Sequence, residues 1–204
     1  MHLPWQQDPF PVMSDHSDHS HEDKDPHGLR AILALYWRAY GGWSALLGSA
    51  FFWLSIALLV VTSPYWLKPS NAWWSQTLSV MPNLLGFTLG GFAVFLAFGD
   101  DQFKKLISGS VPQEDGPSPY LEVSATFLHF VLIQVAALIA AIIGNATTFT
   151  LPGCLAVVSS FLASIRVVGD LFGYWLFLYG ISSAAAAAIA IFRVAYWYDS
   201  YQGK

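Results

Sequence analysis

The side chains able to do acid–base or metal chemistry are few, and most lie outside the apolar segments. The largest group is an acidic, histidine-rich run near the N-terminus that contains His16, His19 and His21. Imidazoles that alternate with carboxylates bind Zn²⁺ or Ni²⁺ loosely. A structural or catalytic metal site, however, needs three or four ligands that a fold holds in place. Residues 1–29 are polar and rich in proline, so we expect a disordered, acidic cytoplasmic tail with no defined metal site.

Two polar side chains, His129 and Gln134, lie inside an otherwise apolar stretch. Burying such groups in lipid costs free energy, so a polar residue within a membrane is a candidate for function. Glu122, Thr126 and His129 share one helical face. The alternative, which we favour, is that His129 lies near a membrane boundary and hydrogen-bonds a neighbouring helix.

Catalytic arrangements are not evident in the apolar segments. Gly180, Ser182 and Ser183 follow a spacing similar to that of serine nucleophiles, and His129 is the one histidine available there as a base. A nucleophile needs a placed base and an oxyanion site, whereas these serines adjoin a plain run of alanines. No predicted span contains an acid, which excludes aspartate-based cleavage. We expect no enzymatic activity and no cofactor.

Asp100 and Asp101 directly follow one of the apolar segments. At the mouth of an assembled pore, such carboxylates favour the entry of cations. The simpler interpretation is that they begin a short surface helix, because aspartate is a preferred N-terminal cap.

The distribution of charge predicts which elements position these residues. Of the 204 residues, 55% are hydrophobic and 11% are charged, whereas soluble proteins carry roughly 25% charged residues. Four long stretches have no charged residue at all: 39–67, 69–99, 123–165 and 171–192. About 20 mostly apolar residues suffice for a helix to cross a membrane. We therefore predict an all-α, multi-pass integral membrane protein with a four-helix transmembrane bundle.

The predicted membrane domain covers residues 30–198 and is followed by a short tail, 199–204. Its spans are predicted at about 44–62, 82–98, 123–143 and 171–192. Pro82 is expected in the first turn of the second span, where its missing N–H is harmless. Residues 154–165 are apolar but short for a crossing, and the alternatives of an interfacial, re-entrant, spanning or helix-extending segment stay open.

Positive charge predicts the orientation of the chain. With four spans and a cytoplasmic N-terminus, seven Lys and Arg residues lie inside and two outside, against six and three for five spans. Because positive residues are retained on the cytoplasmic side, we expect both termini to be cytoplasmic, in a bacterial inner membrane. The net charge of −4 leaves no basic patch for nucleic acid.

Aromatic residues gather at the ends of the predicted spans, where amphipathic rings prefer lipid headgroups. We expect lipid-contacting belts at these positions: Tyr36, Trp37, Tyr40, Trp43, Tyr65, Trp66, Tyr174, Trp175, Tyr196, Trp197 and Tyr198.

Small residues on the second predicted span form the clearest packing pattern. Gly86, Gly90, Ala93 and Ala97 share one helical face, and a close approach of backbones along such a face stabilises helix pairs in lipid. The partner is either the fourth span or another subunit. Gly90→Leu is expected to disrupt this packing, whereas Phe95→Leu, away from that face, is expected to do little.

These patterns favour a small inner-membrane protein that self-associates and acts as a channel, pore or membrane-permeabilising effector. The alternative is a non-enzymatic accessory or scaffold subunit of a membrane complex. The expected partners are the lipid bilayer and either further copies of the chain or a partner membrane protein.

Overall fold

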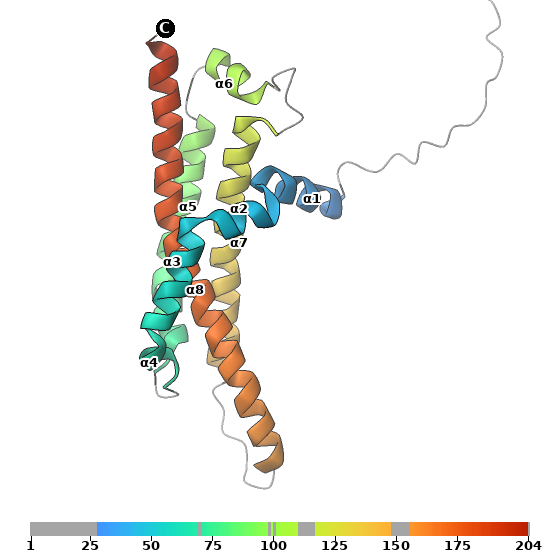
Figure 1. Cartoon of the computed structure of the whole chain (residues 1–204), viewed down its shortest axis with the longest axis vertical. Helices are drawn as coiled ribbons and strands as arrows, with labels where there is room; N and C mark the ends of the chain where they lie inside the picture. Colours follow the sequence, from blue (N-terminus) through green and yellow to red (C-terminus); the bar gives the residue numbers. More distant parts are fainter. Residues whose placement is uncertain are drawn as a thin grey trace, which may run out of the picture.

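The computed structural model describes residues 28–68, 71–97, 99, 101–109, 117–147 and 156–203, and of residues 101, 103, 106 and 156–164 it describes the backbone alone. Within these ranges the chain is helical and has no strand. The helices are, in order, α1 (Leu29–Tyr40), α2 (Gly42–Gly48), α3 (Ala50–Val61), α4 (Ser63–Trp66), α5 (Trp73–Ala97), α6 (Asp101–Ser108), α7 (Pro119–Ala146) and α8 (Ala156–Gln202). The long helices α5, α7 and α8 pack side by side (Figure 1).

In the part of the chain that the structure describes, three helical segments are long and apolar enough to cross a membrane. They are α5, α7 and the Ile165–Gln202 part of α8. Helices α2 and α3 pass the same test only as a pair, which is bent by 55° at Ser49. The prediction of an all-α protein with several membrane-spanning helices is therefore confirmed at this level, and a fourth crossing depends on the bent pair.

Helix α5 begins at Trp73, ahead of the start predicted at Pro82. Pro82 lies inside the helix rather than in its first turn, so the prediction based on proline was wrong. Proline is tolerated inside membrane helices because neighbouring groups satisfy the backbone that it frees. Trp73 and Trp74, which lie ahead of the predicted second span, form the first turn of α5.

Helix α8 begins at Ala156 and continues without a break to Gln202. The part of the ambiguous apolar segment that is described, from Ala156 to Ile165, therefore extends the last helix. Arg166 and Asp170, which are one turn apart, lie 3.8 Å from each other. This pairing, which their spacing predicts, neutralises the charges along the helix.

The packed interior has two parts. The larger part surrounds Trp73 and Met81 and includes Trp66 and Tyr174, which are 8% and 4% exposed. These last two rings contact protein rather than lipid, so the belt expected at their positions is corrected. The smaller part surrounds Phe127, which has no exposed surface.

Phe95 belongs to this second part of the core and is 4% exposed. Its ring centroid lies 5.2 Å from that of Tyr120 and 6.2 Å from that of Phe127. Shortening a core aromatic side chain leaves a cavity. The expectation that Phe95→Leu does little is therefore wrong.

Glycines that the sequence did not single out allow the helices to approach. A Cβ on Gly173 would collide with the Trp73 ring, and one on Gly144 would lie 3.2 Å from the same ring. At the other end of α5, a Cβ on Gly91 would lie 2.8 Å from the Ile191 side chain. These positions are among the close contacts between described helices, whereas Gly86 and Gly90 are not.

Candidate functional site

His129 joins three helices through hydrogen bonds. Its Nδ1 lies 2.7 Å from the Tyr36 hydroxyl of α1, and its Nε2 lies 2.9 Å from the Tyr179 hydroxyl of α8. The Tyr40 ring stacks on the imidazole with centroids 4.1 Å apart. His129 and Tyr179 are buried, at 4% and 2% exposure. The favoured interpretation of His129, a hydrogen bond to a neighbouring helix, therefore agrees with this geometry.

The directions of these hydrogen bonds follow from the neutral state of the imidazole and of the two phenols. A neutral imidazole donates through one nitrogen and accepts through the other, so one phenol donates to His129 and the other accepts from it. Burial, and to a lesser degree the neighbouring Tyr40 phenol, raises the pKa of Tyr36 to about 12. Tyr36 therefore keeps its proton at neutral pH. The arrangement anchors α1 to α7 and α8.

Gln134, the second polar candidate, has no exposed surface and donates from Nε2 to the Thr88 hydroxyl of α5 over 2.9 Å. Its Oε1 is buried and accepts no hydrogen bond from the described residues. Thr88 in turn donates to the Leu84 carbonyl. Gln134 thus bridges α7 to α5 in the packed interior, and its Oε1 is an acceptor without a donor among the described residues.

The small-residue face of α5 points away from the rest of the chain. Gly86, Gly90, Ala93 and Ala97 are all exposed, and a Cβ on Gly86 or Gly90 would meet no described atom within 4 Å. Thr88 and Phe95, on the opposite side of α5, are the residues that face the core. Of the two partners that the sequence left open, α8 does not contact this face.

Polar side chains continue the same face toward the N-terminal half of α5. Ser79 and Asn83 are exposed, and among the described residues their hydroxyl and amide groups donate to carbonyls of their own helix. Asn83 lies about 15 Å along the axis from Trp73 at 1.5 Å per residue, which is well inside a span. The outward face of α5 therefore combines small residues with an amide.

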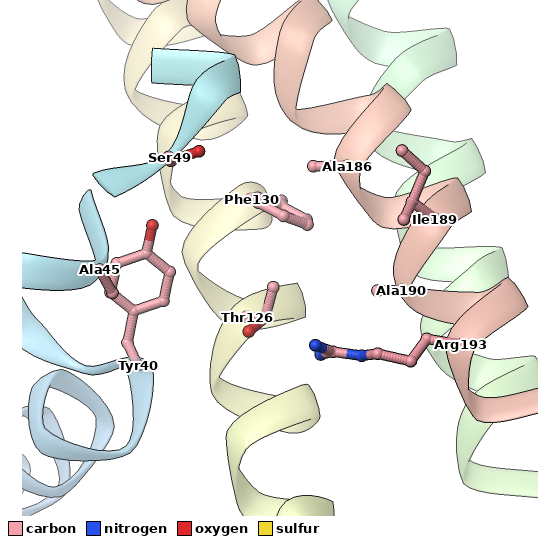
Figure 2. Close-up of a pocket in the computed structure, with 9 residues that line it drawn as sticks. All are labelled: Tyr40, Ala45, Ser49, Thr126, Phe130, Ala186, Ile189, Ala190 and Arg193. Carbon is pink, nitrogen blue, oxygen red and sulfur yellow. The ribbon is translucent and has the colours of Figure 1, made fainter. Parts of the chain in front are cut away.

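A cavity of about 250 Å³ lies between α2, α7 and α8 (Figure 2). Its walls are mostly apolar, and Arg193 extends from α8 toward Thr126 on α7 (Figure 2). Its lining comprises Tyr40, Ala45, Ser49, Thr126, Phe130, Ala186, Ile189, Ala190 and Arg193. The sequence did not predict this site, because helices distant in the chain form it.

The remaining candidates do not assemble with one another. Ser182 and Ser183 donate to the carbonyls of Leu178 and Gly180 in their own helix, and neither is hydrogen-bonded to His129. Asp101 begins α6, but its side chain lies outside the described residues.

Asp100 and the histidines of the tail, His16, His19 and His21, also lie outside the residues that the structure describes. Within the part of the chain that it does describe, no group of three or more His, Cys, Asp or Glu side chains is placed to hold a metal ion.

Comparison of the chain with protein-family models, curated proteins and solved structures found no match.

Proposed function

We propose that the protein is a non-enzymatic membrane protein that self-associates through the outward face of α5. The observation that carries this proposal is the exposure of Gly86 and Gly90, where a Cβ would meet no atom of the described residues within 4 Å. Lipid tails are as apolar as leucine, so membrane helices associate by close packing and hydrogen bonds rather than by excluding water. A smooth face of small residues permits that packing.

Asn83 supports the same interface independently. Its carboxamide is exposed on this face, and a polar group that faces hydrocarbon gains from a hydrogen-bonding partner on another helix. Two copies of α5 related by a two-fold axis bring the same surface of each copy together. The carboxamides of the two copies then lie on one shared interface.

We propose further that the assembled protein acts as a channel, pore or permeabilising effector, with the path between copies. The interior between α5, α7 and α8 is filled by large side chains such as Trp73, Met81 and Phe127. A path through one copy would have to displace them. Conductance of purified protein in planar bilayers tests this step.

A second candidate is a scaffold that holds a partner membrane protein. The same packed interior supports it, because a scaffold needs no conducting path. A stoichiometric partner that co-purifies with the protein, together with an absence of conductance, favours this candidate over the channel.

The bent pair α2–α3 is proposed as a fourth crossing of a bacterial inner membrane, with both termini cytoplasmic. Support comes from the places where α1 and α4 pack. α1 contacts α7 near His129, in the half of the bundle nearer α6, whereas Tyr65 of α4 packs on Tyr174. The pair α2–α3 connects the part of the bundle around His129 with the part around Tyr174.

Cysteine cross-linking in native membranes tests self-association. In a Cys154→Ser background, Ala93→Cys is expected to give disulfide-linked dimers on mild oxidation. Val168→Cys, which is 66% exposed on α8, is the control and is expected to stay monomeric. Equal cross-linking at both positions, or none at Ala93, would contradict the proposed interface.

A further inference from the structure

We propose that the cavity between α2, α7 and α8 binds an anionic phospholipid, whose phosphate pairs with Arg193 while an acyl chain lies along the apolar wall. The proposal does not depend on self-association through α5. It rests on three features: a cation that pairs with no described carboxylate, an apolar wall open at its rim, and an amphipathic helix beside it.

Arg193 is the cation. Its guanidinium lies 5.2 Å from the Trp197 ring centroid, and its side chain is exposed at the cavity (Figure 2). The one ion pair among the described residues joins Arg166 to Asp170, so no described carboxylate pairs with Arg193. A guanidinium beside an apolar wall favours a phosphate, which it can bind through two N–H groups.

The wall supplies the place for a chain of methylenes. Phe130 and Ala190 are buried, at 5% and 6% exposure, while Ile189 is 58% exposed at the rim. A volume of about 250 Å³ falls below the roughly 300–1,000 Å³ of pockets that enclose a drug-sized ligand. The cavity therefore holds one segment of a long molecule, and the rest follows the exposed surface.

Helix α1 indicates that the ligand comes from the membrane rather than from solution. Tyr40, its last residue, forms part of the cavity wall. The exposed side of α1 carries Leu29, Ile32 and Leu33 together with Arg30, and the helix contains no acid. A basic amphipathic helix of this kind lies in the headgroup region and attracts anionic lipids.

Native mass spectrometry of the full chain tests the proposal. The protein in mild detergent is offered equal amounts of phosphatidylglycerol and phosphatidylcholine with identical acyl chains. We expect wild-type protein to retain phosphatidylglycerol over phosphatidylcholine by about fivefold, the effect of one basic side chain near an anionic headgroup. Arg193→Gln is expected to bring that ratio close to one, and Arg193→Lys to keep most of it.

Lys68→Gln is the control, because Lys68 is an exposed basic residue beyond α4 that belongs neither to the cavity lining nor to α1. It is expected to retain the wild-type ratio. Equal retention of the two lipids by wild-type protein, or a wild-type ratio in Arg193→Gln, would overturn the proposal. Displacement of phosphatidylglycerol by inorganic phosphate would also overturn it, because the site would then recognise a free anion rather than a lipid.

Discussion

The indole N–H of Trp73 donates to Oδ1 of Asp170 over 2.7 Å, although the two residues are 97 positions apart. Trp73 is 1% exposed and opens α5, whereas Asp170 lies on α8 beside Arg166. Arg166 in turn lies over the Trp74 ring at 5.8 Å. This group of side chains fixes the start of α5 against α8.

Asp170→Ala is expected to lower the free energy of unfolding by about 1–3 kcal/mol, because a buried indole N–H loses its charged acceptor. Asp170→Asn keeps an acceptor for the indole N–H and is expected to lower the free energy of unfolding by less. Thermal unfolding in detergent measures both. Asp199→Ala, at an exposed position near the end of α8, is the control, and a loss as large as that of Asp170→Ala would count against the bond.

Gly173→Ala is expected to destabilise the protein by about 1–3 kcal/mol, the usual cost of overpacking, because its Cβ would collide with the Trp73 ring. On the same helix, the Cβ of Gly169→Ala meets none of the described atoms within 4 Å. It is expected to be neutral or to gain up to about 1 kcal/mol from helix propensity. Similar melting temperatures for the two variants would show that Trp73 does not pack on Gly173.

His129→Leu is expected to loosen α1, because it removes the group that binds both the Tyr36 and the Tyr179 hydroxyls. We expect amide hydrogen exchange in residues 29–40 to accelerate by about tenfold, equivalent to the loss of one to two hydrogen bonds. Amides of residues 73–97, in α5, provide the internal reference. Unchanged exchange in α1 would mean that other contacts hold it in place.

Thiol labelling of intact cells tests the proposed orientation. Tyr201 near the end of α8 donates to Gln102 of α6 over 3.3 Å, which places α6 and the C-terminal end of the chain together (Figure 1). In a Cys154→Ser background, Ser108→Cys is expected to resist an impermeant maleimide, whereas Lys68→Cys is expected to react. Gly28→Cys tests the fourth crossing. If this thiol resists the maleimide, α2–α3 spans the membrane; if it reacts, α2–α3 does not.

The sequence predicted the long apolar helices because lipid demands uninterrupted apolar stretches, and this demand is visible in composition. It misplaced their ends for local reasons. Pro82 predicts a helix start, but a membrane helix also tolerates proline inside it, as α5 does here. For the last helix, the spacing of Arg166 and Asp170 predicts a pair across one helical turn and a helix that begins ahead of the span, and α8 does continue through both residues.

The candidate sites were predictable only in part. The polarity of His129 was visible in the sequence, but its partners Tyr36 and Tyr40 come from a helix far away in the chain. The small-residue face of α5 was also visible, because it follows helical periodicity. Periodicity does not say which face meets the core, and Phe95 was therefore misjudged.

The mass of the purified assembly in mild detergent tests self-association through α5 most directly. Gly90→Leu and Gly169→Leu place the same side chain at two positions where a Cβ meets no atom of the described residues within 4 Å, but only Gly90 lies on the outward face of α5. We expect wild-type protein and Gly169→Leu to be oligomers and Gly90→Leu to shift toward monomer. Overpacking that costs about 1–3 kcal/mol lowers the association constant by roughly ten- to hundredfold. A monomeric wild-type protein, or the same mass distribution for both variants, would contradict the account.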